Sequence, residues 1–370
     1  MSPWRNGRRR EPAGGGAGSA TLPGRPIETP GREAPEDGPG RHGQAARVGP
    51  ARIPAAAPPG ETTVPTTAPR SYYGQPVLKE PVWTFEIPWY MFAGGLAGAS
   101  APLAFAARLA GNHRLARAAL TAGAAALAVS PPLLISDLGR PERFHHMLRV
   151  LRPTSPMSVG SWLLTALSPA MIGAAVADRL GITPRLGRTA EGVAALLGPA
   201  LATYTAVLVA DTAVPAWHEA GAELPVVFAG GAAASAGAAA CLLTPPEHAG
   251  PARRLAVGGA VAELAAAQVM EQRLGELGEP YRRGRAGRLS VLAKALSVTG
   301  AAVLGLAGRR RPAAIAGSLL LLAGSACERH AVIEAGRQSA RDPKYVVGPQ
   351  RRRLDERGGV HAPGPETAGL

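Results

Sequence analysis

Five long stretches of the sequence contain no charged residue and no histidine, and they limit the possible folds more than any other feature. They cover residues 87–107, 118–136, 153–177, 192–210 and 224–246, and each has between 19 and 25 residues. The hydrocarbon core of a membrane is crossed by about 20 apolar residues in a helix. Unpaired backbone polar groups are too costly in lipid for such stretches to be anything but helices. The pattern excludes an ordinary soluble protein and predicts an all-α integral membrane protein.

Three weaker apolar stretches follow, at about 255–271, 290–308 and 312–327. With them, the sequence predicts eight transmembrane helices of a multi-pass protein of the cell (plasma) membrane. Glu263 lies near the middle of the first weak stretch, and ionisable groups at that depth are usually functional. We expect Glu263 to belong to a proton path or, alternatively, to pack between helices with Gln268. Lys294 is expected to extend its amine to the membrane surface.

Two of the stretches begin alike. The segment EIPWYMFAGGLAGAS starts at Glu86 and ELPVVFAGGAAASAG starts at Glu223, so an acid, a proline and the letters FAGG recur. The shift equals four helices, which predicts two repeated four-helix bundles at 86–211 and 223–330. An acid before a proline suits the positive start of a helix. The alternative is that each carboxylate accepts a proton at the membrane edge.

The flanks differ from the helical part. Residues 1–70 are dense in Gly, Pro, Ala and Arg and are predicted to form a disordered basic tail. Residues 71–85 hold Tyr72, Tyr73 and Trp83 and are predicted to be an interfacial aromatic segment. Residues 337–370 are predicted to be a C-terminal tail. We expect the chain to be surrounded by the lipid bilayer. We expect it to bind no nucleic acid.

A charged loop, SDLGRPERFHH at residues 136–146, separates two uncharged stretches. Pro141 followed by an acid indicates a new helix start. Phe144, Leu148 and Leu151 follow at helical spacing, which predicts a short amphipathic helix at the membrane surface. Its basic residues are expected to form a cover over a pocket or a docking surface for a soluble partner. The docking candidates are Arg143, His145, Arg149 and Arg152.

Several chemistries are excluded by residue types. The eight histidines lie in tails, loops or helix ends, which speaks against a haem between helices. Only Cys241 and Cys327 are cysteines, whereas an iron–sulfur cluster needs about four thiolates. No metal site and no catalytic residue is predicted in this chain. The remaining chemistry is a pocket with carboxylates, Tyr, His and Arg at one membrane face, which suits a quinol if a partner accepts its electrons.

Three segments carry a resemblance. YYGQPVLKEPVWTFEIPWYMFAGGLAGAS, LLISDLGRPERFHHMLRVLRPTSPMSVGSW and DTAVPAWHEAGAELPVVFAGGAAASAG resemble the NrfD/polysulfide reductase membrane-subunit family, in its actinobacterial, molybdoenzyme-associated type. The resemblance covers about residues 72–350. It implies an eight-helix subunit without haem that binds menaquinone near a docked four-cluster ferredoxin-like iron–sulfur subunit. That subunit exchanges electrons with a molybdopterin catalytic subunit of the polysulfide or thiosulfate reductase or formate dehydrogenase type.

The resemblance also implies a quinone site at the start of the first helix, the end of the second and the fourth. Some relatives have Asn and His near the start of the first helix, where this chain has an acid and aromatics. Glu86 or Asp211 is expected to accept a proton, His218 or Tyr90 to hold a quinone oxygen, and Arg140 to pair with Asp137. Two alternatives are a transporter built from a parallel four-helix repeat and a purely structural anchor. The quinone-site candidates are Glu86, Tyr90, Asp137, Arg140, Tyr204, Asp211 and His218.

Overall fold

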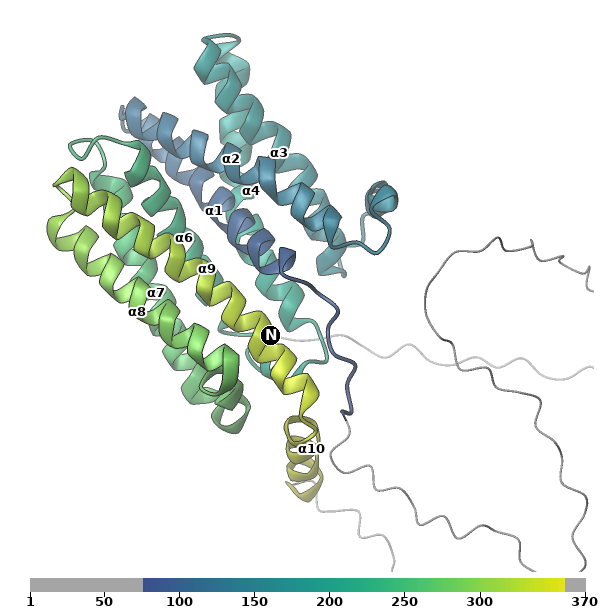
Figure 1. The fold of residues 1–370 in the computed structure, drawn as a ribbon. Helices are drawn as coiled ribbons and strands as arrows, with labels where there is room; N and C mark the ends of the chain where they lie inside the picture. The colour runs from purple at the N-terminus through teal and green to yellow at the C-terminus, as the bar shows by residue number, and fades with distance from the viewer. Residues whose placement is uncertain (1–75, 357–370) are drawn as a thin grey trace, which may run out of the picture. The chain divides into compact units, whose positions relative to one another are not determined.

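The computed structural model describes residues 76–356, and all regular structure in that part of the chain is helical (Figure 1). The predicted tail at 1–70, Tyr72, Tyr73 and the chain after 356 lie outside the described residues. Six described helices are long and apolar enough to cross a membrane, which confirms an all-helical integral membrane protein. They are α1 (Glu86–Leu109), α2 (His113–Ser136), α3 (Pro156–Leu180), α4 (Pro184–Ala210), α6 (Leu224–Leu243) and α8 (Gly284–Ala307).

Two further long helices, α7 (Gly250–Arg273) and α9 (Arg311–Arg341), fall outside those six spans. Both carry charged residues along their length, so they are less apolar than the others. Helix α9 continues past residue 337, and α10 (Lys344–Glu356) follows it, within the stretch that the sequence assigned to a C-terminal tail. Eight membrane crossings therefore stay a prediction.

The long helices pack in the same order in each half of the chain. Helix α1 contacts α2 and α4, and α3 contacts α4; likewise α6 contacts α7 and α9, and α8 contacts α9. The two leading helices, α1 and α6, pack against each other (Figure 1). We call α1–α4 the first bundle and α6–α9 the second bundle. This shared order agrees with the predicted repeat, which stays a prediction.

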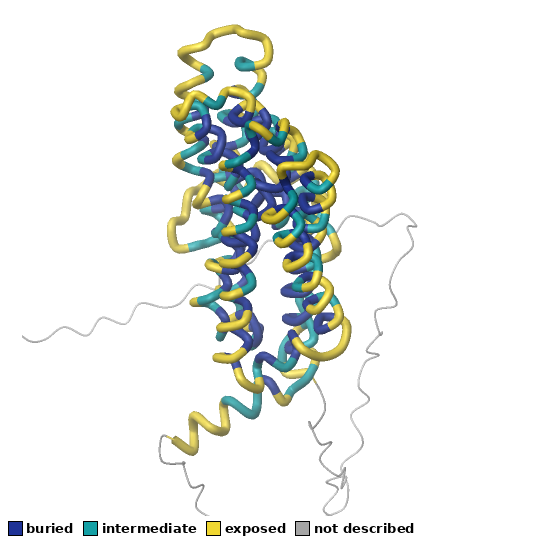
Figure 2. The backbone as a smooth tube through the Cα atoms, turned by 90° about the vertical axis from the view of Figure 1, so that its left-hand side faces the viewer, coloured by how far each residue is buried: buried dark blue, intermediate teal, exposed yellow. Residues whose placement is uncertain are grey.

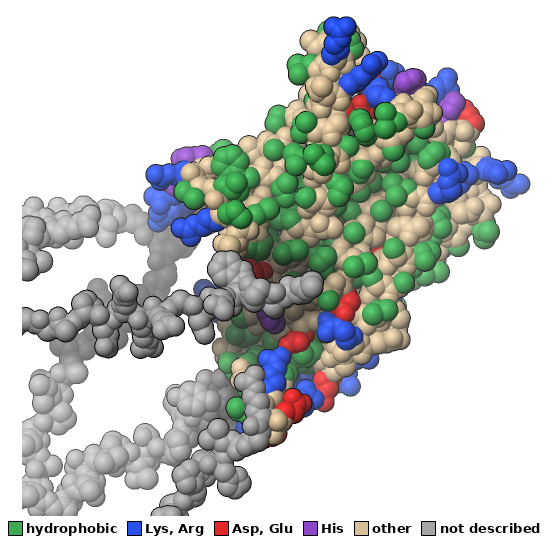
Figure 3. All heavy atoms as spheres, turned by 180° about the vertical axis from the view of Figure 1, so that it is seen from behind, with side chains coloured by type: hydrophobic (Ala, Val, Ile, Leu, Met, Phe, Trp, Pro, Cys, Tyr) green, Lys and Arg blue, Asp and Glu red, His purple; other side chains and the backbone are tan. Residues whose placement is uncertain are grey.

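Glycines let these helices touch through their backbones. A side chain on Gly98 of α1 would overlap the carbonyl of Gly198 in α4, and one on Gly259 of α7 would overlap backbone atoms of α6. Close contact of this kind is typical of helices in membranes, where small residues permit dense packing. Figure 2 shows that buried residues gather where the helices face one another. The outer side of the helices, seen in Figure 3, is largely hydrophobic, with most Lys and Arg near its edges.

The helix ends define two faces. The Glu86 face consists of the starts of α1, α3, α6 and α8, the ends of α2, α4, α7 and α9, and three short helices. The Arg108 face consists of the ends of α1, α3, α6 and α8 and the starts of α2, α4, α7 and α9. The short helices of the Glu86 face are η1 (Pro141–Leu148), α5 (Pro215–His218) and η2 (Gly275–Tyr281).

Helix α5 joins the two bundles and is fixed by Trp217. The Trp217 indole is fully buried, stacks on Trp83 at 5.4 Å and donates to the carbonyl of Val332 in α9 at 2.7 Å. Gly336 of α9 lacks a side chain at the point where the indole lies, and a Cβ there would overlap the ring. The connection between the bundles is therefore anchored on the last long helix.

Candidate functional site

A cavity of about 700 Å³ on the Glu86 face lies between α3, α4 and the α5 segment. Three predicted quinone-site residues line it, Tyr204, Asp211 and His218, and its other walls are mainly apolar. Asp211 follows the last residue of α4, and its N–H donates to the carbonyl of Val207 at 2.9 Å. The His218 ring lies 3.2 Å from the carbonyl of Ala210, so it folds back toward the end of α4. Residues from α4 and α5 thus converge on one cavity.

Two predicted quinone-site residues, Tyr90 and Tyr204, contact each other next to this cavity. The hydroxyls of Tyr90 in α1 and Tyr204 in α4 are hydrogen-bonded, and Tyr90 is only 1% exposed. The Tyr204 ring has room because Gly160 of α3 lacks a side chain where a Cβ would overlap it. The hydroxyl pair links the cavity to the interior of the first bundle. Gly160 carries no sequence signal for this role, since nothing distinguishes it from other helix glycines.

Two predicted carboxylates, Glu86 and Asp137, share a neutral partner. The Thr84 hydroxyl contacts Glu86 and lies 2.7 Å from Oδ1 of Asp137, while the Thr84 N–H donates to the same oxygen at 3.1 Å. A hydroxyl has one hydrogen to donate, so it satisfies one carboxylate at a time. Thr84 could not be recognised from the sequence, because it lies in a segment whose aromatic residues indicate an interfacial position.

The predicted pairing of Arg140 with Asp137 does not form within residues 76–356. Arg140 lies just before η1 and is exposed, whereas Asp137 contacts Thr84 before the start of α1. Arg140 also does not line the 700 Å³ cavity, and it has no hydrogen bond to Thr84 or Glu86 among the described contacts. The structure therefore separates Arg140 from the other quinone-site candidates.

The two acids of the predicted repeat have different partners. Glu223 forms an ion pair with Arg273 at the end of α7, and Arg273 also donates to the carbonyl of Glu219. Glu86 contacts only the hydroxyl of Thr84 among the described residues. The ion pair makes Glu223 a tie between α6 and α7. Glu86 has a neutral hydrogen-bonding neighbour instead, so the two acids differ in their structural role.

The charged loop forms the 3₁₀ helix η1 rather than an α-helix. Phe144, Met147 and Leu148 line a cavity of about 220 Å³ with apolar residues of α2 and α3. Leu151 lies after η1 and is 55% exposed, so its predicted place on the apolar face is wrong. A 3₁₀ helix has three residues per turn, which aligns Phe144 with Met147. The four docking candidates are exposed: Arg143, His145, Arg149 and Arg152.

Interior charges in the second bundle have partners that the sequence did not indicate. Glu263 is 3% exposed and lies 4.0 Å from Arg329 of α9, so it packs between helices as the alternative expected. The expected partner, Gln268, is wrong, because Gln268 is exposed. Lys294 was expected to extend its amine to the membrane surface. Its amine instead lies 2.6 Å from Oε1 of Glu271. Both corrections have one cause, because each partner comes from another helix and only packing brings it near.

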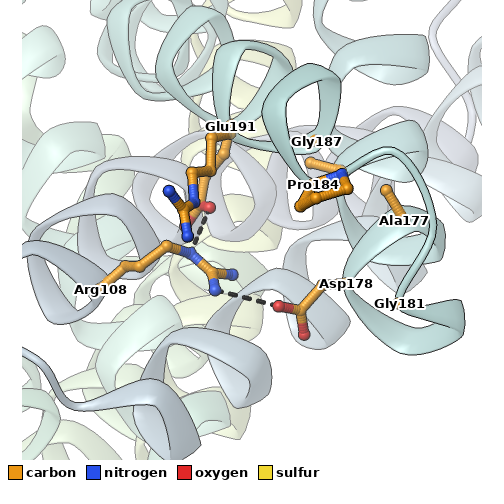
Figure 4. Close-up of a pocket in the computed structure, with 9 residues that line it drawn as sticks. Arg108, Ala177, Asp178, Gly181, Pro184, Gly187 and Glu191 are labelled. Carbon is orange, nitrogen blue, oxygen red and sulfur yellow. Dashed lines mark hydrogen bonds and ion pairs between the residues drawn. The ribbon is translucent and has the colours of Figure 1, made fainter.

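The Arg108 face holds a separate ionic cluster around a cavity of about 160 Å³ (Figure 4). Arg108 bridges Glu191 and Asp178, and its distance to Asp178 is 3.0 Å. Arg117 adds a second contact to Asp178 at 2.9 Å. Glu191 is only 2% exposed. The sequence showed these residues only as the charges that end the apolar stretches.

The fold defines the class of this molecule: a multi-pass helical membrane protein with a polar-lined cavity at one end of its helices. Comparison with family models matches residues 76–274 to the family described as polysulphide reductase, NrfD. Because this match covers more than half of the chain, the protein belongs to the NrfD family. Comparison with curated proteins finds no match.

Proposed function

We propose that this protein is the quinone/quinol-binding membrane-anchor subunit of a respiratory molybdopterin oxidoreductase complex in the plasma membrane. In this proposal it passes electrons between menaquinone and an iron–sulfur partner subunit. The supporting observation is the 700 Å³ cavity, where a tyrosine, a carboxylate and a histidine converge among apolar walls. Ligand sites of this size typically combine apolar walls with a few convergent polar groups, and a quinone has that chemistry.

The proposed roles follow from the geometry. Oxidation of a quinol releases two protons and two electrons, and the electrons leave to the redox centre of the partner. Asp211 accepts one proton at the cavity, and His218 hydrogen-bonds a quinone oxygen. The other proton passes along the hydroxyls of Tyr204 and Tyr90 toward Glu86, which lies one helical turn before Tyr90. Quinone reduction uses the same groups in reverse.

Variants of the assembled complex test the cavity. We expect Asp211→Asn to lower quinol-linked turnover about 100-fold, a usual loss for a proton-accepting group, and Tyr204→Phe to lower it less. Glu247→Gln, an exposed acid before α7, is the matched control and keeps full turnover. Binding of a short-tailed naphthoquinone to the purified complex separates binding from proton transfer. Unchanged turnover in Asp211→Asn and Tyr204→Phe would overturn the proposal.

The proposed docking surface for the iron–sulfur subunit is the outer side of η1 and the residues after it. The apolar side of η1 covers the cavity between α2 and α3, so the basic side chains point away from the helices. We expect Arg143→Glu with Arg149→Glu to reduce co-purification of the partner. The matched control, Arg185→Glu with Arg254→Glu, reverses two exposed charges on the Arg108 face. Equal co-purification of both variants would show that η1 is not part of the interface with the partner.

A further inference from the structure

Another cavity of the Arg108 face is lined by three arginines, and we call it the arginine pocket. It has a volume of about 260 Å³ and lies where the start of α2 meets the ends of α3 and α6. No acid lines it, and one threonine supplies the only side-chain hydroxyl of its lining. The residues that the argument uses are Arg114, Arg117, Thr121, Arg179 and Leu243.

Two of the three arginines contact no acid. Arg114 lies 3.1 Å from Nε2 of His248, and Arg179 donates to the Thr121 hydroxyl at 3.0 Å. Within residues 76–356, neither arginine forms an ion pair. A guanidinium has five N–H donors, so each of the two keeps several donors for another acceptor.

The third arginine, Arg117, belongs to a balanced ionic group. It contacts Asp178 at 2.9 Å, and Arg108 contacts the same carboxylate at 3.0 Å. Arg108 also pairs with Glu191, so two arginines face two acids (Figure 4). The charges of the other two arginines of the pocket therefore remain as a surplus, and this surplus attracts an anion.

An apolar groove of about 640 Å³ continues from the arginine pocket between α1, α2 and α6. Leu243 of α6 lines both cavities, and on α2 Thr121 of the pocket directly precedes Ala122 of the groove. No charged residue lines the groove, and five of its lining residues are alanines. These short side chains hollow the surface between larger neighbours, so the groove can hold an apolar chain.

The groove has about the length of one membrane leaflet. Its lining residues on α2 run from Ala122 to Leu133, which lies eleven positions later. At a rise of about 1.5 Å per residue this is about 17 Å, and half of a hydrocarbon core is about 15 Å. Trp89, near the start of α1, lines the groove toward the Glu86 face. An acyl chain that starts at the arginine pocket therefore fits within the groove.

We propose that the arginine pocket and the apolar groove together bind one anionic phospholipid. Phosphate oxygens match the fork of a guanidinium, and basic pockets between transmembrane helices bind anionic headgroups. Arg114 and Arg179 hold the phosphate, and one acyl chain lies along α2. The surplus charge favours phosphatidylglycerol over phosphatidylcholine, because the choline cation would meet further cations.

The proposed lipid site differs from the quinone cavity in place and in ligand. The quinone cavity lies on the Glu86 face between α3, α4 and the α5 segment. The lipid site begins on the Arg108 face, and its helices α2 and α3 belong to the first bundle while α6 belongs to the second. A bound phospholipid therefore joins the two bundles at the face opposite to the quinone cavity.

The test is native mass spectrometry of the purified full-length protein in detergent, titrated with phosphatidylglycerol or with phosphatidylcholine of the same acyl chains. We expect one phosphatidylglycerol to bind with a Kd at least five-fold lower than that of phosphatidylcholine. Arg114→Gln with Arg179→Gln is expected to abolish this preference. The matched control is Arg185→Gln with Arg254→Gln, which removes two exposed charges of the same face outside both cavities. It keeps the preference.

A further variant tests the groove without changing a charge. Ala125 is exposed in the groove, so Ala125→Trp fills the groove without disturbing the core. We expect it to weaken binding of both lipids at least five-fold and to keep the preference for phosphatidylglycerol. Ala166→Trp, at an exposed alanine of α3 outside the groove, is the matched control and binds like the wild type. Melting temperatures verify that each variant folds.

Four results would overturn the proposal. The first is equal affinity of the wild type for the two lipids, and the second is equal loss of preference in the two arginine pairs. The third is wild-type affinity in Ala125→Trp. The fourth is a dimer mass that Ala125→Trp converts to a monomer mass, which would assign the groove to a second copy of the chain.

Discussion

The two bundles pack their helices in the same order but place their polar groups differently. In the first bundle the interior polar contact is a pair of hydroxyls, Tyr90 and Tyr204, and the ionic contacts lie at the Arg108 face. In the second bundle the interior itself holds an ion pair between Glu263 and Arg329. The first interior contact joins two neutral hydroxyls, whereas the second joins two charged groups of α7 and α9. One arrangement of four helices thus accommodates two kinds of interior polar contact.

The largest expected effect comes from breaking the interior ion pair of the second bundle. Arg329→Ala leaves Glu263 buried without its cation, and we expect the free energy of unfolding to fall by about 3–5 kcal/mol. The double variant Glu263→Gln with Arg329→Met removes both charges and recovers most of that loss. Denaturant unfolding in detergent measures both, with exposed Arg185→Ala as a control. A double variant as unstable as Arg329→Ala would show that charge pairing does not determine stability here.

A smaller effect is expected at the ionic cluster of the first bundle. Arg108→Gln removes a cation shared by Asp178 and Glu191, and the expected loss is about 1.5–3 kcal/mol. The loss is smaller than for Arg329 because 20% of the Arg108 side chain is exposed to water. Arg117→Gln is the matched control, since it also contacts Asp178 but is 57% exposed. Equal losses for the two arginines in the same unfolding assay would contradict the role of burial.

The hydroxyl pair should contribute less again. Tyr90→Phe leaves the Tyr204 hydroxyl without its protein partner, and we expect a loss of about 1 kcal/mol. Tyr204 lines the cavity, so water can replace the missing bond. The double variant Tyr90→Phe with Tyr204→Phe is expected to lose little more than either single variant, because the two residues share one interaction. Fully additive losses in thermal unfolding would show that the hydroxyls act independently.

The smallest effect concerns the rim of the second bundle, where α10 is held by Glu279. The hydrogen bond from Lys344 holds the pKa of Glu279 below its ordinary value of 4.5. A lowered pKa means that this contribution to docking is complete above about pH 4.5 and is lost as the pH falls through the lowered pKa. A spin label at the exposed Gln350 should therefore become more mobile in acid.

Glu279→Gln is the control for that measurement. It should make the label more mobile at neutral pH and remove most of the change on acidification. The effect is small because Glu279 lies at the surface, where water screens ion pairs. If the mobility of the label in Glu279→Gln still changed with pH as in the wild type, another group would be responsible for the pH dependence.

Much of the fold could be predicted because it depends on local sequence. Uncharged stretches of sufficient length marked five of the six candidate spans directly, and the sixth, α8, was found in spite of Lys294. Asp211 and His218 were placed on one face by the order of the helices, whereas Tyr204 was indicated only by the resemblance to the NrfD family. The partners of buried charges could not be predicted in this way. Arg329 lies 66 residues after Glu263, so only the packing of α7 against its neighbours brings them together.

Local conformation limited the prediction of the site in other ways. The interpretation of η1 as an α-helix misplaced Leu151, since spacing alone does not distinguish three from 3.6 residues per turn. Thr84 carries no sequence signal as a partner of two carboxylates, because a threonine before a helix usually serves as a cap. Contacts of this kind depend on the position of α2 beside the start of α1.

The anchoring of Trp217 has a consequence for the order of biosynthesis. Trp217 precedes His218 in the segment that lines the cavity, and its indole rests on Gly336 and Val332 of α9. A ribosome synthesises those residues more than 100 positions later, so the nascent chain inserts its first bundle before this cavity wall can settle. The match to the NrfD family ends at residue 274, before α8 and α9 begin. Completion of the cavity in this protein therefore waits for a C-terminal stretch outside that match.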